Sequence, residues 1–281
     1  MLVSKIEPSI PCLGICRYHE VKIANRDYNS DLHPGNILLR LPRSIDDLSQ
    51  TQLNALYGEP ELEPVLRIDD KPLSPGVPSH VILPIWLGKA SEHVTISEAY
   101  IFLTDFGESF DPSKTARYIS RTPIIFSPPE AHFYPDEPLS FPADIWTLAC
   151  TIWGILGQRP LFEGWNASAD WMTKEHVEVL GLLPSPWWEQ WDAREKWFHS
   201  DGTRKGGGVG RGLAERLEDS IQQPRRESGM EEIGEVETTA LFEMLKTMLA
   251  FHPEQRSSAK EVLESEWMRK WALPELSKLG S

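Results

Sequence analysis

One strongly apolar stretch, Phe141–Gln158, constrains the fold more than any other part of the sequence. Pro142 and Asp144 fall in its first turn, as is typical at the start of a helix. The predicted helix carries apolar side chains nearly all round, from Ile145, Trp146, Leu148, Ala149, Cys150, Ile152, Trp153 and Leu156. Such a helix must be surrounded by protein, so the chain should fold around it as a mainly α-helical domain.

A second feature is the hexapeptide Asp31-Leu32-His33-Pro34-Gly35-Asn36, followed at once by the apolar run Ile37-Leu38-Leu39. The Pro-Gly turn between an acid and an amide predicts a loop that directs both side chains into one cleft. In phosphoryl transfer, such an Asp accepts the proton of the attacking hydroxyl and such an Asn holds Mg²⁺. Taken alone, the spacing favours a solvated turn over a catalytic loop.

A third feature places another acid at the end of a strand. Ala99-Tyr100-Ile101-Phe102-Leu103 has the composition of a buried strand and stops at Thr104-Asp105-Phe106-Gly107. An Asp in that position can chelate a metal that bridges nucleotide phosphates. Downstream of Asp31 and Asn36, this pattern indicates a nucleotide site.

Two more positions connect distant parts of the chain. Ser127-Pro128-Pro129-Glu130-Ala131 precedes the apolar helix, and Leu245–Trp267 predicts two short helices around a His252-Pro253 turn. Arg256 is the basic group of that turn. From these residues alone a solvated surface arginine is favoured, whereas a buried ion pair between Glu130 and Arg256 would tie the two regions together.

In this order, the motifs resemble the carboxyl-terminal lobe of a eukaryotic protein kinase over about residues 28–275. The run Lys174–Pro184 and the long connection before Asp105 are most similar to the SR-protein kinases of fungal type. The resemblance implies a mainly α fold with a few short strands around the catalytic and metal-binding loops. It also implies transfer of the ATP γ-phosphate to Ser or Thr of Arg/Ser-rich proteins.

The resemblance also implies roles for single residues. Asp31 would be the catalytic base, Asn36 and Asp105 would hold Mg²⁺, and Phe106 and Gly107 would complete the nucleotide site with ATP. His33 stands where serine/threonine kinases usually have a Lys that contacts the transferred phosphate. Glu130 and Arg256 would form a structural pair, and Asp144 would anchor the backbone of the catalytic loop. We assign no substrate role to Thr122.

Two other functions remain open. A kinase needs a Gly-rich loop and a strand Lys ahead of its catalytic loop, and we expect the chain as given to lack both. Lys22 lies too near Asp31, and Gly206–Gly212 does not fit a phosphate loop. One alternative is therefore a non-catalytic pseudokinase or binding scaffold. The other is a small-molecule phosphotransferase of the aminoglycoside or choline type, which shares the base and metal residues but lacks the other motifs.

The predicted organisation surrounds the kinase-like lobe, 28–275, with an irregular lead segment, 1–27, and a tail, 276–281. Residues 57–80 and 199–230 are predicted surface inserts because they are rich in Gly, Pro or charge. The first is acidic, which is typical of a solvated linker or of a docking site for a basic partner. The tryptophans of 170–198 are predicted to pack against other helices, since no basic groove accompanies them.

The net charge of −14 favours basic protein partners and disfavours direct binding to nucleic acid. The three cysteines, Cys12, Cys16 and Cys150, have no zinc-site spacing, so we predict neither a disulfide nor structural zinc. No apolar run of about 18 residues and no signal-peptide pattern occur, so we expect no membrane association and a cytoplasmic or nuclear location.

Overall fold

The computed structural model describes residues 31–41, 45–85, 87–88, 98, 100–165, 167–206 and 210–274. The predictions for residues 1–27, for Lys22 and for the tail 276–281 lie outside these residues. The chain divides into two compact units, one formed by Arg40–Ala90 and the other by the remainder. Each unit is described by itself.

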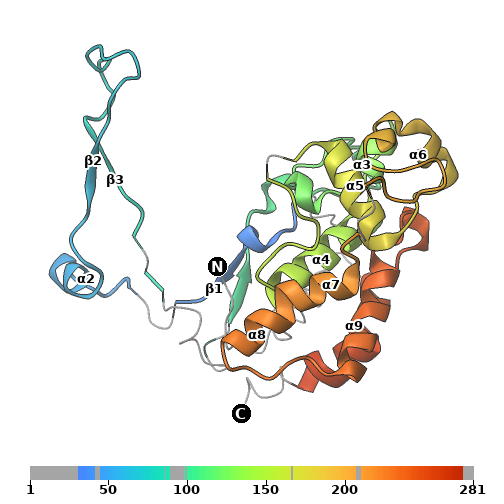
Figure 1. Ribbon diagram of the computed structural model, residues 1–281. Helices are drawn as coiled ribbons and strands as arrows, with labels where there is room; N and C mark the ends of the chain where they lie inside the picture. The colour runs from blue at the N-terminus through green and yellow to red at the C-terminus, as the bar shows by residue number, and fades with distance from the viewer. Residues whose placement is uncertain are drawn as a thin grey trace. The chain divides into compact units, whose positions relative to one another are not determined.

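The larger unit is mainly helical, as predicted, with one two-stranded sheet (Figure 1). Strands β1 (Ile37–Leu39) and β4 (Ile101–Leu103) are antiparallel, with Leu38 opposite Phe102. The α-helices among its described residues are α3 (Glu130–Phe133), α4 (Phe141–Leu156), α5 (Ala169–Leu180), α6 (Ser185–Gln190), α7 (Leu213–Leu217), α8 (Gln223–Glu227), α9 (Glu235–Met248) and α10 (Ala259–Leu263). Within the residues that the structure describes, none of the helices could cross a membrane.

Helix α4 is the centre of the main core, as its all-round apolar surface predicts. Trp146 and Trp153 are 0% exposed, and the polar Thr147 and Thr151 are buried with them. The helix packs against α9, whose apolar face contributes Leu241 and Leu245 to the same cluster (Figure 1). Helix α4 is therefore enclosed by protein along most of its length.

The aromatic residues of the 170–198 region form a second cluster, which confirms their predicted packing role. Trp187, Trp191 and Phe198 are buried together with Val177 and Leu183. The ring of Phe133 stacks on Trp187 with centroids 4.9 Å apart. This cluster fixes α3 against α6 and the following 3₁₀ helix η6 (Asp192–Lys196).

The prediction that all of 199–230 is a surface insert is wrong for its second half. Leu217 and Ile221, from α7 and the π-helical turn η7 (Glu218–Gln222), belong to the main core. One charge there is buried and paired: Arg216 is 2% exposed and its Nη2 lies 2.8 Å from Glu175 Oε2 on α5. The Gly-rich, charged composition concealed these internal partners. Residues 207–209 lie outside the described part of the chain.

His176 on α5 is a buried titratable group with no hydrogen-bond partner for either ring nitrogen. Its ring meets Trp146 and Phe162 edge to face, at centroid distances of 5.0 Å and 4.5 Å. Burial, followed by the nearby charge of Arg256, lowers the pKa of His176 to about 3. The imidazole is therefore neutral in the folded protein throughout the physiological range.

We expect this histidine to make stability depend on pH. Because its pKa is lower in the folded chain than in the unfolded chain, its contribution is complete above about pH 6.5 and is lost as the pH falls toward 3, by up to about 1.4 kcal/mol per pH unit. His176→Leu should flatten the slope of unfolding free energy between about pH 6.5 and 4.5, measured by urea denaturation. His199→Asn, at an exposed position, is the control. Identical slopes in wild type and His176→Leu would contradict this expectation.

The smaller unit holds helix α2 (Gln50–Tyr57) and a hairpin of β2 (Leu62–Pro64) and β3 (His80–Ile82). The apolar spacing of residues 44–56 predicts a helix in this region, but α2 begins only at Gln50. Ser49 and Gln52 form a capping box, with Gln52 N 3.3 Å from Ser49 Oγ and Ser49 N 2.9 Å from Gln52 Oε1. This cap, rather than the apolar spacing, sets where the helix starts.

Candidate active site

The predicted catalytic loop, residues 31–36, is held in shape by its own short-range hydrogen bonds. Gly35 N donates to His33 Nδ1 at 3.1 Å, and Asn36 N donates to the His33 carbonyl at 3.0 Å. A Cβ on Gly35 would lie 2.7 Å from His33 Cε1, so only glycine fits against the imidazole ring. The other face of that ring stacks near Phe126, with centroids 6.1 Å apart. His33 therefore has a fixed orientation.

Two contacts join this loop to the core. Leu32 is 1% exposed and belongs to the main core cluster. Pro34 lies so close to α4 that a Cβ on Gly154 would sit 3.2 Å from Pro34 Cγ. The side chains on either side of this anchor, Asp31 and Asn36, are therefore placed by the central helix.

The loop brings the predicted base and the predicted metal ligand together. Asn36 Nδ2 donates to the Asp31 carbonyl at 3.0 Å and to Asp31 Oδ2 at 3.2 Å. Asp31 Oδ1 is buried and accepts no hydrogen bond, although His33 Nε2 lies 3.6 Å away. The Asn36 amide thus orients the Asp31 carboxylate, and Asp31 Oδ1 remains able to accept a hydrogen bond from another donor.

Strand pairing brings Asp105 to the same place from far along the chain. β1 and β4 pair so that Thr104, the residue before Asp105, donates from N and Oγ1 to the Asn36 carbonyl at 3.0 Å and 3.2 Å. Asp105 has φ 60° and ψ 60°, a left-handed conformation that is uncommon for a residue with a Cβ and often marks a functional site. Phe106 and Gly107 continue into the 3₁₀ helix η4 (Phe106–Glu108).

The pKa of Asp31 responds to the charges of its neighbours in the loop and in the turn after β4. Burial raises the pKa of Asp31, and the charges of Asp105 and Glu108 raise it further, while His33 and the Asn36 hydrogen bond act in the opposite direction. Sequence reasoning missed Glu108. Its position three residues after Asp105, in the turn that follows the strand, was the available signal.

The donor set suits a hard divalent cation such as Mg²⁺. Asn36 uses its Nδ2 toward Asp31, which leaves its amide oxygen as a ligand beside the Asp105 carboxylate. Oxygen ligands of this type, in small number, are typical of Mg²⁺ held together with nucleotide phosphates. Within the described residues, no group of three or more His, Cys, Asp or Glu side chains forms a metal cluster. A metal here would thus rely on the nucleotide for the rest of its coordination.

The structure contains the ion pair expected between Glu130 and Arg256. Arg256 Nη1 and Nη2 lie 2.7 Å and 2.6 Å from Glu130 Oε1 and Oε2, a bidentate arrangement. The Arg256 side chain is 0% exposed, and its remaining donors bond to the carbonyls of Pro142, Ala250 and Phe251. The pair joins α3 to the segment before α10.

Two further predicted positions are buried. Asp144 on α4 is 1% exposed, and its carbonyl accepts a hydrogen bond from Thr147 Oγ1 at 2.9 Å. Its role as an anchor of the catalytic loop stays a prediction. Thr122 is 7% exposed in the segment between η4 and α3.

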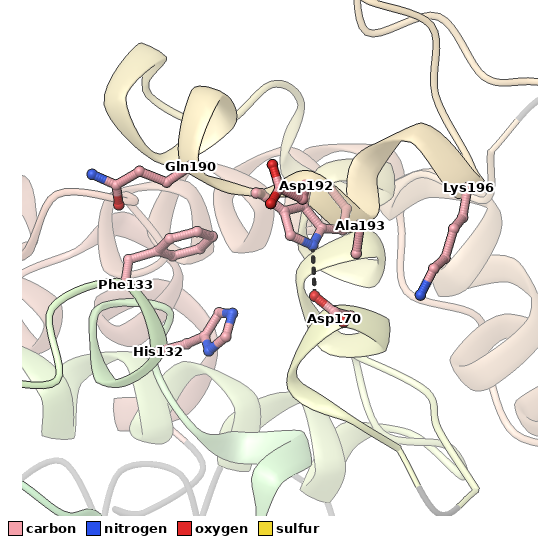
Figure 2. A pocket seen from close by; sticks show the side chains of 8 residues that line it. His132, Phe133, Asp170, Gln190, Asp192, Ala193 and Lys196 are labelled. Atoms are coloured by element: carbon pink, nitrogen blue, oxygen red, sulfur yellow. Dashed lines mark hydrogen bonds between the residues drawn. The ribbon is translucent and has the colours of Figure 1, made fainter.

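A pocket of about 560 Å³ opens beside α3 (Figure 2). Its lining combines two acids with aromatic and amide side chains and one Lys: His132, Phe133, Asp170, Gln190, Trp191, Asp192, Ala193 and Lys196. Trp191 Nε1 donates to Asp170 Oδ1 at 2.9 Å, the dashed line in Figure 2. Asp192 is exposed at the mouth. The pocket could accept a side chain that is both cationic and flat.

Comparison with known families identifies the family to which the chain belongs. The protein kinase domain model matches residues 91–268, more than half of the 281-residue chain. The chain therefore belongs to the protein kinase family and carries the domain of a kinase-type phosphotransferase. No curated protein matches the sequence.

The matched range includes Asp105, Glu130, Asp144 and Arg256, but Asp31 and Asn36 precede it. The pairing of β1 with β4 joins the two parts, because it places the Asn36 carbonyl against Thr104. The site thus combines residues from inside and outside the matched range.

Proposed function

We propose that the protein is a serine/threonine protein kinase of the SR-protein-kinase type, which uses ATP and Mg²⁺ to phosphorylate Arg/Ser-rich proteins. The observation that carries this proposal is the meeting of Asp31, Asn36 and Asp105 at one end of the β1–β4 sheet. In the proposal, these three residues supply the base and the two metal ligands that phosphoryl transfer requires.

In this proposal, Mg²⁺–ATP supplies the transferable phosphoryl group and the cation that neutralises its charge. Asn36 and Asp105 hold the cation. Asp31 accepts the proton of the substrate hydroxyl at Oδ1, and the pKa of Asp31, raised by burial, makes it a stronger base. His33, fixed by Gly35 and Phe126, lies beside the same oxygen, with its Nε2 3.6 Å from Oδ1.

The substrate class is argued from charge. The chain carries a net charge of −14, and the pocket beside α3 is lined by the Asp170 and Asp192 carboxylates, the half-buried ring of Phe133 and one cation, Lys196. Guanidinium groups bind carboxylates and also stack on aromatic rings. The arginines of an Arg/Ser-rich segment would therefore be complementary to this pocket in charge and shape. The reaction of a small-molecule phosphotransferase does not require such a pocket.

Phosphoryl transfer also needs a β-rich nucleotide lobe, and the described residues contain no Gly-rich loop followed by a strand Lys. We therefore propose that peptide binding and phosphoryl transfer are separable activities of this chain. The 281-residue chain should bind Arg/Ser peptides, and rapid transfer should require a version joined to a kinase nucleotide lobe.

Binding of a fluorescent Arg-Ser repeat peptide to the 281-residue chain tests the substrate class. Affinity should fall steeply once salt brings the Debye length below about 8 Å. Asp192→Asn should weaken binding by about threefold to tenfold, because an exposed carboxylate is removed from the pocket. Glu243→Gln, an exposed change on α9, serves as the control. If the affinity does not change with salt concentration, or if Asp192→Asn and Glu243→Gln bind the peptide equally well, the pocket has no role in substrate recognition.

A further inference from the structure

The hairpin of the smaller unit is a short antiparallel ladder. Leu62 pairs with Ile82, Glu63 with Val81, and Pro64 with His80. Two more bonds extend it, from Leu83 N to the Glu61 carbonyl and from Val65 N to the Ser79 carbonyl, both 2.9 Å. Its register is therefore fixed over five residues of each strand.

The two faces of this ladder differ in chemistry, because side chains alternate along a strand. One face carries Leu62 and Ile82 directly opposite each other, 59% and 68% exposed, and Leu66 follows the same alternation at 81%. The opposite face carries Glu63 beside Val81, with Glu61 two residues earlier. Val65 and Leu83 share that second face, and His80 and Pro64 share the first. The hairpin thus has one largely apolar face and one face on which two acids stand among apolar side chains.

Nothing in the described part of this unit covers the apolar side. Helix α2 contains no buried residue, and none of the buried core side chains comes from Arg40–Ala90. A two-stranded hairpin is marginal in water unless a third strand or a covering surface joins it. The hairpin is therefore incomplete as a folding unit.

Backbone direction shows which edge can accept another strand. The backbone groups of the odd-numbered residues Glu61, Val65, Ser79 and Leu83 bond to the other strand of the hairpin. The backbone N–H and C=O groups of the even-numbered residues therefore point away from the hairpin, toward its two open edges. On β2 the outward position 64 is proline, which has no N–H. On β3 both outward residues, His80 and Ile82, retain their donors.

The β3 edge is also limited in length. Pro78 and Pro84 stand at the next outward positions on either side. Flanking prolines stop open-ended strand addition, the usual hazard of an exposed edge. What remains is a short edge with two donors, suited to a specific partner strand.

Charge defines that partner. The acids in the described residues 45–85 are Asp46, Asp47, Glu59, Glu61, Glu63, Asp69 and Asp70. The basic side chains there, Arg67 and Lys71, both pair with Asp69. No basic group is thus recorded beside Glu61 or Glu63 among the described residues, and their face is open to cations supplied from outside.

We propose that the β3 edge of this hairpin binds an extended segment of another protein in which apolar and basic residues alternate. The segment adds a third strand by bonding to His80 and Ile82. Its apolar side chains extend the Leu62–Ile82 face, and its long basic side chains reach over Val81 toward Glu61 and Glu63. This site is independent of phosphoryl transfer and takes a different peptide from the Arg/Ser-rich substrate.

A fluorescein-labelled peptide of alternating valine and lysine, titrated into the full 281-residue chain, tests the proposal by fluorescence anisotropy. Saturable binding is expected. Glu61→Lys combined with Glu63→Lys should weaken it by about tenfold or more, through reversal of the facing charges. Ile82→Pro should weaken it to a similar degree, because it removes an outward donor that the hairpin itself does not use. Glu231→Lys with Glu243→Lys, a matched charge reversal in the larger unit, should leave the affinity within about twofold.

Three outcomes would overturn the proposal. The first is no saturable binding of the valine–lysine peptide. The second is equal affinity in the Glu61→Lys/Glu63→Lys variant and its matched control. The third is self-association of the chain, measured by sedimentation velocity, that Leu62→Ser with Ile82→Ser abolishes, because the apolar face would then belong to a second copy.

Discussion

Arg256→Ala is expected to lower the free energy of unfolding by about 3–5 kcal/mol. The guanidinium group is 0% exposed and binds Glu130 through two hydrogen bonds, so its removal leaves a carboxylate uncompensated in the interior. It also deprives the carbonyls of Pro142, Ala250 and Phe251 of their donor. Urea denaturation followed by circular dichroism measures the change.

Arg269→Ala, an exposed arginine of the same terminal region, is the matched control and should shift stability by less than about 0.5 kcal/mol. Arg256→Lys should recover part of the loss, since an ammonium keeps the charge but cannot make the bidentate contact. An Arg256→Ala variant as stable as the control would mean that the pair contributes nothing to the fold.

Asp31→Asn is expected to lower kcat by about 10²- to 10⁴-fold in a version of the chain joined to a kinase nucleotide lobe. Asparagine keeps the shape of the side chain and can still bond to Asn36, but it cannot take the proton of the substrate hydroxyl. KM for the Arg/Ser peptide should change little, because Asp31 is not part of the pocket beside α3. Radiolabelled phosphate transfer gives both constants.

The control for this experiment is Asp136→Asn, an exposed acid outside the site. Asp105→Asn in the same assay should raise the Mg²⁺ concentration needed for half-maximal rate, an effect that Asp31→Asn should lack. Equal rates in the Asp31→Asn and control proteins would exclude the carboxylate as the base. Background transfer in every protein, with peptide binding retained, would favour a non-catalytic scaffold instead.

The elements that the sequence predicted best are those with strong local signals. Helix α4 follows from a stretch apolar on all sides, and the strand before Asp105 follows from its β-branched and aromatic residues. The site residues could be listed from their motifs. Their convergence followed only from the family resemblance, because it depends on the pairing of β1 with β4 across a long insert.

The harder cases involve charges whose partners are remote in sequence. Arg216 sits in a stretch rich in glycine and charge, yet it is buried by Glu175, a residue on a different helix. His176 was equally hard to predict: it is a titratable residue, yet its ring packs against Trp146 and Phe162. Composition gives the sign of a charge but not its surroundings, and burial in both cases is decided by tertiary packing.

The insertion point of the hairpin unit has a consequence for how the active site forms. The chain leaves the larger unit after β1 and returns before β4, and these two strands are hydrogen-bonded neighbours. The contact between Asn36 and Thr104 therefore closes a long loop, whose entropy cost rises by only about 0.6 kcal/mol for each doubling of length. The insert can thus change in length with little penalty to the pairing of Asn36 with Thr104. Because this pairing joins residues far apart in the sequence, it is a long-range contact of the kind that slows folding.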